Sequence, residues 1–417
     1  MQIRHLIFLI LLLSLFRVSH ADESLVTLKD LEQEALKNNP EILMAEKRVE
    51  SADEKKSLAS ALPDPMVGYA VQNVGSPGVW SVGKEDMSMQ GVVFTQEIPF
   101  PGKLGTKGRI AGKEAERTEQ GARETKLRVL NSLKNAYYEY FLAFKSAEIL
   151  DQTKELLKNS QRIAETRYAT GQGMQQDVVR AQLEVSMILD RLTEEEQKKE
   201  TQASLINSLV GRNPLAPLGR PEELPRATPT VTMDELAAMA LDHSPVLQGK
   251  ERMVEQSREE LSLSRREFLP DMVVSGGWFT RGDKSDVWQA SLMFKVPLYF
   301  WNKSTGVKAA SADLSAARYE YDAERLATLA RVRDLYSTIK TAEHRIELYE
   351  AGIIPQARLS LQSTTSNYQV GKSDFTSLLE SENTLLKYQL MEQEELVNLN
   401  KTMSMLNELT GEDHHEN

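Results

Sequence analysis

The sequence predicts a mainly α-helical protein with a small β part, built from two copies of a repeat in which two strands precede a very long helix. Three observations support this fold class. No proline occurs between Pro101 and Pro214, and the residues between them are rich in Glu, Lys, Ala, Leu and Arg, as a long helix requires. Short segments of alternating apolar and polar residues precede this stretch and its counterpart in the second half. Sequence landmarks also recur in the same order about two hundred residues later.

Four landmarks define the duplication. TLKDLEQEALKNNPEIL resembles TMDELAAMALDHSPVL, and VVFTQEIPF matches SLMFKVPLYF. RYATGQGMQQDVVRAQ then matches NYQVGKSDFTSLLESE, and SLVG matches ELTG. We therefore place a first repeat at residues 22–211 and a second at 232–411, followed by a polar tail at 412–417. The segment 212–231 between them contains five prolines and is expected to be an extended linker, either a mere spacer or a small docking surface.

The N-terminus has the pattern of a secretory signal peptide, residues 1–21. Arg4 supplies the positive charge, an apolar stretch follows, and Ser19 and Ala21 provide the small residues of a cleavage site. The apolar stretch is shorter than the ~18 residues that a membrane-spanning helix needs, and no later stretch reaches that length. The chain is therefore predicted to be exported without a helical anchor.

Composition excludes several functions. Without residues 1–21 the chain carries 48 basic and 61 acidic residues, a net charge of −13, which argues against nucleic acid as a partner. The absence of cysteine excludes disulfides, thiolate metal sites and a cysteine nucleophile. Gly102, Gly105 and Gly108 imitate a phosphate loop without its lysine-hydroxyl pair, and His414 and His415 fit a frayed polar end better than a metal site. We therefore expect no enzyme activity, no cofactor and no metal site.

Each half is expected to contain the same elements. It begins with a helix of about thirty residues, at about 28–60 in the first half. Two strands, a long helix and a return helix follow. In the first half these lie at about 66–74, 88–98, 102–168 and 175–209, and in the second half at about 272–280, 287–296, 303–368 and 375–409.

Alternation is clearest in the last strand. Trp288, Leu292 and Phe294 alternate there with Gln289 and Lys295, so one face is apolar. All four tryptophans lie in or beside the strand regions, as in the aromatic girdles of a transmembrane barrel, although a buried sheet explains part of this pattern. The four girdle candidates are Trp80, Trp278, Trp288 and Trp301.

Four strands cannot close a barrel in lipid, because an open sheet leaves unpaired backbone groups in hydrocarbon. If these strands span a bilayer, several chains must share one barrel. A dimer supplies eight strands and a trimer twelve, and only the wider ring leaves room for an open pore.

The return helices carry apolar residues at coiled-coil spacing. This spacing predicts that both helices pack along one seam, although ordinary packing in an extracytoplasmic bundle gives the same pattern. The seam residues are Val178, Ala181, Val185, Ile188, Leu192, Ile206 and Leu209 in the first half, and Leu378, Ser381, Leu385, Tyr388, Leu399, Leu406 and Leu409 in the second.

The layout and motifs resemble the TolC family of outer-membrane efflux proteins. The motifs are QEIPFPGK after the second strand, KVPLYFWNK after the fourth, and the paired Y-x-x-G sequences. The stretch from Ile353 to Leu386, with Pro355 inside the second long helix, resembles the branch that exports heavy-metal cations.

The resemblance implies a homotrimer, with a 12-stranded barrel in outer-membrane lipid above a long α-helical barrel that extends into the periplasm of a Gram-negative bacterium. It also implies coupling to a periplasmic adaptor, a membrane fusion protein, and to an inner-membrane pump of the RND type. Such a subunit exports substrate through a conduit gated at its periplasmic helical tips and performs no chemistry.

The two turns after the long helices match the periplasmic tips of the family. The resemblance therefore implies adaptor docking at Tyr168, Gly171, Gly173, Tyr368 and Gly371. Glycine suits sharp turns because it accepts positive φ.

Two acids near the tips are candidates for the gate or the pore lining. Asp177 either caps its helix or acts at the gate, and Glu380 is either a solvated surface residue or one of three acids in a cation-selective ring.

The main alternative is a periplasmic coiled-coil adaptor or scaffold that does not span a membrane. Such adaptors also have long helical hairpins, but they place β-rich modules around one hairpin instead of duplicating two strand pairs with tryptophan at their ends. An extracytoplasmic enzyme is a more distant alternative.

Overall fold

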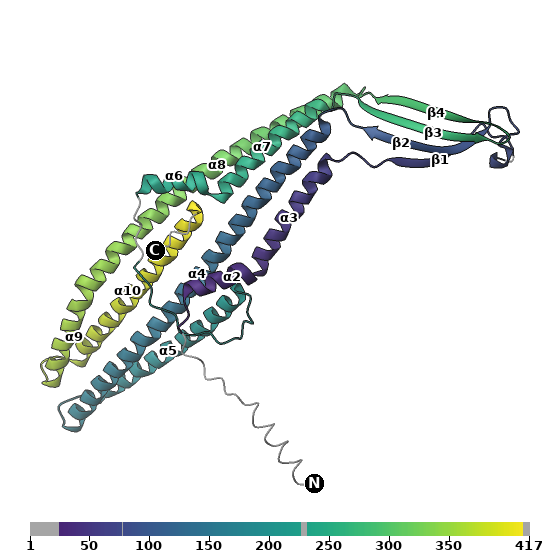
Figure 1. Ribbon diagram of the computed structural model, residues 1–417. Coiled ribbons are helices and arrows are strands. Elements are labelled where there is room, and N and C mark those ends of the chain that lie inside the picture. Colours follow the sequence, from purple (N-terminus) through teal and green to yellow (C-terminus); the bar gives the residue numbers. More distant parts are fainter. Residues whose placement is uncertain (1–24, 77, 227–231, 412–417) are drawn as a thin grey trace, which may run out of the picture. The chain divides into compact units, whose positions relative to one another are not determined.

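The computed structural model describes residues 25–76, 78–226 and 232–411 (Figure 1). The predicted signal peptide, 1–21, and the polar tail, 412–417, lie outside the described residues. The fold class is confirmed: the chain is mainly helical with a small β part, and the element order of the first half recurs in the second.

The first half contains seven described elements, and its long helix is 67 residues long. They are α2 (Leu28–Asn38), α3 (Pro40–Ser60), β1 (Met66–Gln72), a short 3-10 helix (Gly78–Ser81), β2 (Met89–Ile98), α4 (Lys103–Ala169) and α5 (Gln175–Leu209).

In the second half, the long helix is divided into α8 and α9 by a π-helical turn. The elements are α6 (Met233–His243), α7 (Pro245–Arg266), β3 (Asp271–Arg281), β4 (Lys284–Lys295), α8 (Phe300–Glu347), the π-helical turn (Leu348–Ile353), α9 (Ile354–Gln369) and α10 (Phe375–Thr410).

Two compact units divide the chain, and each contains segments of both repeats. One unit comprises Met1–Leu43, Lys126–Ala240 and Ala330–Asn417, and the other comprises Met44–Thr125 and Leu241–Leu329. The first unit holds the apolar cores around α5 and α10. The second holds the sheet.

The sheet is an antiparallel meander in the order β1-β2-β3-β4 (Figure 1). Residues that pair directly across two strands lie on the same face of the sheet. Tyr69, Val92, Trp278 and Trp288 form one row across the four strands. Val67, Phe94, Gly276 and Ala290 form the next row. Most of the large side chains in these rows are highly exposed, so the sheet has an uncovered apolar face.

The opposite face of the sheet carries polar groups. Thr95, Ser275 and Ser291 lie in one row, and the two serine hydroxyls are 2.7 Å apart. Lys295 and Glu97 also lie on this face, 3.8 Å apart. The alternation predicted for the fourth strand is therefore confirmed. One face of the sheet is apolar, and the other is mixed, because it also carries Val273, Phe279 and Met293.

The prediction of one unbroken helix at 28–60 is wrong. The helix stops at Asn39, which is extended (φ −66°, ψ 123°) because the residue before Pro40 is disfavoured in helical conformation. The buried Asn39 side chain then accepts hydrogen bonds from the backbone N–H groups of Glu41 and Ile42, 2.8 and 3.3 Å long, and begins α3. Ser244 (φ −59°, ψ 117°) precedes Pro245 and breaks the helix of the second half for the same reason, but its side chain makes no cap bond.

The second predicted long helix, 303–368, is not a regular α-helix throughout. Its π-helical turn ends where the Ile354 N–H bonds the carbonyl of Tyr349, five residues back. Pro355 follows directly. Proline has no N–H and its ring crowds the carbonyl four residues earlier, so widening the preceding turn lets the helix continue past it.

The proline-rich linker is not a mere spacer. The Val26 N–H bonds the Arg220 carbonyl at 2.8 Å, and the Tyr140 hydroxyl bonds the Gly219 carbonyl at 3.1 Å. The Glu222 N–H donates to the Tyr137 hydroxyl at 3.0 Å. Since Leu218 and Leu224 also pack on the core around Tyr137, residues 212–226 form part of the first unit.

The two return helices share one core near the tips, whereas Ile206 and Leu209 lie in a second core and Leu399, Leu406 and Leu409 lie in a third. Ala181 and Ile188 of α5 are buried in the same core as Leu378 and Leu385 of α10. The other predicted seam residues named in these cores are buried or partly buried, among them Val178, Val185, Leu192, Ile206, Leu209, Tyr388, Leu399, Leu406 and Leu409.

Candidate functional site

The candidate site is the pair of turns at the ends of the two helical hairpins, α4–α5 and α9–α10. Gly171 and Gly371 have φ of 71° and 75°, which favours glycine because it has no side chain to clash. In both turns the N–H after this glycine bonds back across five residues, from Gln172 to Arg167 and from Lys372 to Asn367, each at 2.8 Å. This is the Schellman arrangement, which ends a helix and reverses the chain.

Tyr368 joins the two hairpins. Its side chain is buried, its hydroxyl donates to the Asp177 carboxylate at 3.2 Å, and its ring packs on Phe375 with ring centres 5.4 Å apart. The Arg167 guanidinium lies 4.6 Å from the same ring and also donates to the Tyr368 carbonyl. We call these contacts among Tyr368, Asp177 and Arg167 the tip tether.

Ionisation of the Tyr368 phenol does not switch the tip tether near neutral pH. Burial, together with the negative Asp177 carboxylate, raises the pKa of Tyr368 to about 12. The phenol therefore stays protonated and keeps its hydrogen bond to Asp177.

Of the two alternatives for Asp177, a helix cap and a gate interaction, the structure does not contain the cap. The cap residue of α5 is Met174, which makes no side-chain bond, and the Asp177 carboxylate bonds Tyr368 of the other hairpin instead. In the second turn Asp374 does cap α10 by accepting from the Ser377 N–H at 2.8 Å. Hydrogen bonding to Ser377 lowers the pKa of Asp374. The two copies have therefore diverged at their tips.

The other predicted tip residues lie outside the tether. Tyr168, the counterpart of Tyr368, is 49% exposed, and Glu380 is exposed on α10. Gly173 has no positive φ, but a Cβ there would lie 3.0 Å from the Arg167 side chain, so the turn leaves little room for a larger residue.

Sequence reasoning missed Arg167 and Glu382. Arg167 precedes Tyr168 where the second copy has Asn367, an asymmetry that is visible in the sequence. Glu382 is only 4% exposed and accepts a 2.6 Å hydrogen bond from the Ser160 hydroxyl of α4. Its position, four residues after Leu378 and three before Leu385, is a signal for burial between helices.

The predicted girdle residues lie towards both ends of the strands. Trp278 and Trp288 pair across β3 and β4 near their connecting turn, and Trp80 lies in the β1–β2 connection at the same end. Trp301 lies in the first turn of α8, just after β4, with its ring centre 5.4 Å from that of Tyr299. All four indoles are exposed.

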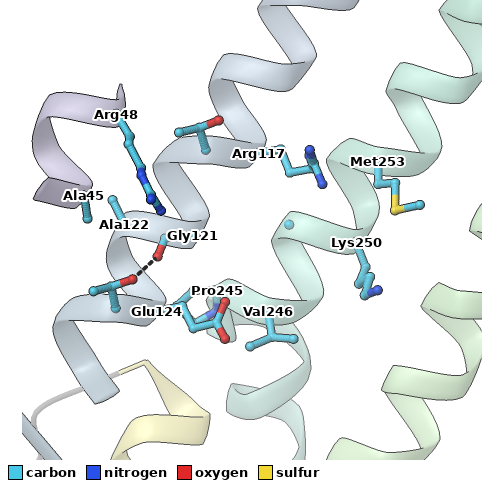
Figure 2. Close-up of a pocket in the computed structure, with 13 residues that line it drawn as sticks. Ala45, Arg48, Arg117, Gly121, Ala122, Glu124, Pro245, Val246, Lys250 and Met253 are labelled. Carbon is cyan, nitrogen blue, oxygen red and sulfur yellow. Dashed lines mark hydrogen bonds between the residues drawn. The ribbon is translucent and has the colours of Figure 1, made fainter. Parts of the chain in front are cut away.

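One groove of the second unit lies between α3, α4 and α7 (Figure 2). It encloses about 340 Å³ and is bordered by the cations Arg48, Arg117 and Lys250. Arg117 pairs with Glu114 and Lys250 with Glu320, so two of the three charges are already neutralised. Nothing in this groove resembles a catalytic arrangement.

Metal-binding groups are scattered in the part of the chain that the structure describes. No three His, Asp or Glu side chains there are grouped closely enough to hold an ion. Across the same residues, no helix is both long and apolar enough to cross a bilayer.

A family profile described as outer membrane efflux protein matches residues 31–212 and 236–412. The chain belongs to this family. Cobalt-zinc-cadmium resistance protein CzcC of Cupriavidus metallidurans is 19% identical over 308 residues, which cover 73% of each chain. Cation efflux system protein CusC of Escherichia coli is 20% identical over 385 residues, covering 86% of this chain and 80% of CusC.

Solved structures show the same fold. The outer membrane protein VceC of Vibrio cholerae superimposes with a TM-score of 0.79 at 21% identity, over 92% of this chain and 96% of VceC. The predicted family, the outer-membrane location and the efflux-channel function are therefore confirmed. The alternative of a periplasmic scaffold that never enters a membrane is wrong.

Proposed function

We propose that three copies of the chain form one efflux conduit, which crosses the outer membrane through a shared 12-stranded barrel. The uncovered apolar face of the sheet supports this proposal, because lipid can cover it while the polar face lines the channel. The outer edges of β1 and β4 have no partner strand among the described residues, and a third copy brings the total to twelve strands.

The tip tether is the observation that carries the gating part of this proposal. Efflux requires the hairpin tips to separate, and the Tyr368–Asp177 hydrogen bond opposes that separation within each chain. Opening replaces this bond by bonds to water, which changes the free energy by only about 1 kcal/mol per tether. Such a tether is strong enough to bias the gate towards closure and weak enough for a docking partner to release.

The docking partner is a periplasmic adaptor that binds the tip surface formed by Tyr168, Gly171, Gly173 and Gly371, with Tyr368 behind it. An inner-membrane pump of the RND type supplies the energy, so this subunit performs no chemistry and needs no cofactor. The cargo is heavy-metal cations, an assignment supported by the names of the relatives CzcC and CusC. Glu380, exposed near the tip, lines the pore as a ring of three carboxylates and favours cations.

Conductance in planar bilayers tests the gate. Tyr368→Phe removes only the hydroxyl, and Asp177→Asn removes the charge of the acceptor. Both variants should spend more time open and conduct more than the wild-type protein. Tyr319→Phe is the matched control, because it deletes a hydroxyl from an exposed tyrosine of α8 that lies outside the tips.

Unchanged conductance in both tether variants would show that these contacts do not hold the gate. The cargo is tested separately, by measuring the accumulation of zinc, cobalt, cadmium and copper in cells that lack the protein. Equal accumulation with and without it would contradict the assignment of metal cations.

A further inference from the structure

The junction between β2 and α4 is locked by a residue from the other repeat. Asp271, the first residue of β3, accepts hydrogen bonds from the Phe100 N–H at 2.7 Å and from the Lys103 ammonium at 2.8 Å. The same ammonium donates to the Leu269 carbonyl at 2.9 Å, and Lys103 is only 4% exposed. The start of β3 is therefore fastened to the point where β2 turns into the long helix.

The duplication repeats both halves of this lock. Leu269, Pro270 and Asp271 correspond to residues 62–64, which are also Leu-Pro-Asp. Lys103 after β2 corresponds to Lys303 after β4, where the segment between proline and lysine is two residues longer. Asp64 is exposed, and no described residue forms an ion pair or hydrogen bond with its carboxylate. The second copy of the lock would consist of Asp64 and Lys303. Within one chain these two residues cannot meet, because Asp64 precedes β1 at one edge of the sheet and Lys303 follows β4 at the other edge.

The β2–β3 register predicts how those two edges meet. Glu97 lies opposite Val273. Glu97 precedes Pro99 by two residues, as Lys295 precedes Pro297, and Val273 follows Asp271 by two, as Met66 follows Asp64. The pairing equivalent to Glu97 with Val273 therefore sets Lys295 of one copy opposite Met66 of another. Because the strands are antiparallel, moving back along β4 moves forward along β1, so Leu292 pairs with Tyr69 and Gln289 with Gln72.

The faces of the strands agree with this register. Leu292 and Tyr69 both lie on the exposed apolar face of the sheet, and Gln289 and Gln72 both lie on the opposite face. A slip by one residue would set residues of one face opposite residues of the other face along the whole edge, and would place Tyr69 opposite Ser291 or Met293. Continued along the strands, this register forms seven pairs, from Met66 with Lys295 to Gln72 with Gln289. These pairs use all of β1, the shorter edge strand.

We propose that a second copy of this chain adds its β1 to β4 in this register, and that its Asp64 binds Lys303 at the β4–α8 junction. The inference rests on the proposed trimer and specifies the seam between its chains. Lys303 already contacts Glu267 at 2.8 Å, but an ammonium has three donors, and Lys103 likewise serves two acceptors in the intrachain lock.

Disulfide trapping tests the register, because the chain has no cysteine of its own. Gln72→Cys with Gln289→Cys places two thiols directly opposite each other, within the distance that a disulfide spans. Gln72→Cys with Ser291→Cys is the matched control, shifted by two residues on the same face, because Ser291 would lie opposite Gln72 if Phe294, and not Pro297, marked the equivalent position. The two positions lie on strands at opposite edges of one sheet, so a disulfide must join different chains.

The double variant should be trapped as covalent trimers on the order of tenfold faster than the shifted control. Equal or faster trapping of the control would overturn the register. Mass measurement of the detergent-solubilised protein separates the two proposals. A monomer would overturn the trimer itself, whereas a trimer without trapping of either pair would overturn only this seam.

A double-mutant cycle tests the Asp64 contact. Asp64→Asn and Lys303→Met should each lower the temperature at which the trimer dissociates in detergent, and together they should lower it by less than the sum. Asp64→Asn combined with Lys103→Met is the control and should be additive, because Lys103 serves Asp271. Additivity in the first cycle would overturn the contact.

Discussion

Glu382 should make the packing between the two hairpins sensitive to pH. Its side chain lies in the apolar core with Leu378 and Leu385, and it receives one hydrogen bond, from Ser160 at 2.6 Å. Its second carboxylate oxygen, Oε2, is buried without a hydrogen-bond partner in the structure. Burial, and to a smaller extent the negative charge of Glu184, raise the pKa of Glu382 to about 7.

The magnitude follows from the difference between the folded and unfolded pKa values. The unfolded value is 4.5, so the folded protein binds this proton more tightly. Stability from this group is therefore fully present below pH 4.5, falls as the pH rises towards 7, and is lost above 7. The total loss is about 3 kcal/mol per chain, since each pKa unit corresponds to roughly 1.4 kcal/mol.

Thermal unfolding of wild type and Glu382→Gln between pH 5 and pH 8 measures this effect. The glutamine keeps the shape but cannot ionise, so the variant should match the wild type at pH 5 and be more stable at pH 8. Glu165→Gln, on an exposed position of α4, should leave the pH dependence unchanged. A difference between wild type and Glu382→Gln that is the same at every pH would refute the reasoning.

Two further predictions concern the tips. Gly171→Val or Gly371→Val forces a β-branched residue into positive φ, at a cost of about 1–2 kcal/mol, and should abolish export while trimers still assemble. Gly121→Val is the control, because Gly121 lies inside α4, has no positive φ, and has no heavy atom beyond its own helix backbone within 4 Å of an added Cβ. Normal export by both tip variants would contradict the role of these glycines in the tip turns. Glu380→Gln should lower cation selectivity, measured as the reversal potential in planar bilayers under a salt gradient. Glu165→Gln, exposed near the end of α4, is its control, and an unaltered reversal potential in Glu380→Gln would count against a ring of carboxylates.

Local patterns in the sequence predict most of this fold. The alternation around Trp288 and the seam through Leu378 depend on periods of two and about three and a half residues, which a sequence displays directly. The breaks at Pro40 and Pro245 also follow from a local signal, because the residue before a proline is disfavoured in helical conformation. The prediction of one continuous helix at 28–60 did not take this restriction into account.

The candidate site was harder to predict because its contacts join distant residues. Tyr368 and Asp177 are 191 positions apart, and neither their types nor their spacing shows that the two hairpins meet there. The same holds for Glu382, whose burial depends on Ser160 of another helix, 222 positions away. Docking of the linker depends on the hydroxyls of Tyr137 and Tyr140, which a count of prolines cannot reveal.

The divergence of the two copies predicts a second, weaker contact at the gate. Within one chain Tyr368 meets Asp177. In a ring of three duplicated chains the counterpart of this contact joins Tyr168 of one copy to Ser377 of the next, where the acid is missing and Asn367 replaces Arg167. Tyr168 is 49% exposed within one chain, as a side chain at a contact between chains would be.

Restoring the acid should therefore tighten the gate. Ser377→Asp supplies an acceptor for Tyr168, and an acid is favourable in the first turn of α10 because of the helix dipole. The variant should conduct less than wild type in planar bilayers, and adding Tyr168→Phe should reverse that change. Ser373→Asp, in the preceding turn, controls for added negative charge. Lower conductance that persists after Tyr168→Phe would mean that the new charge acts without this contact, and the pseudo-symmetric arrangement of the tips would be wrong.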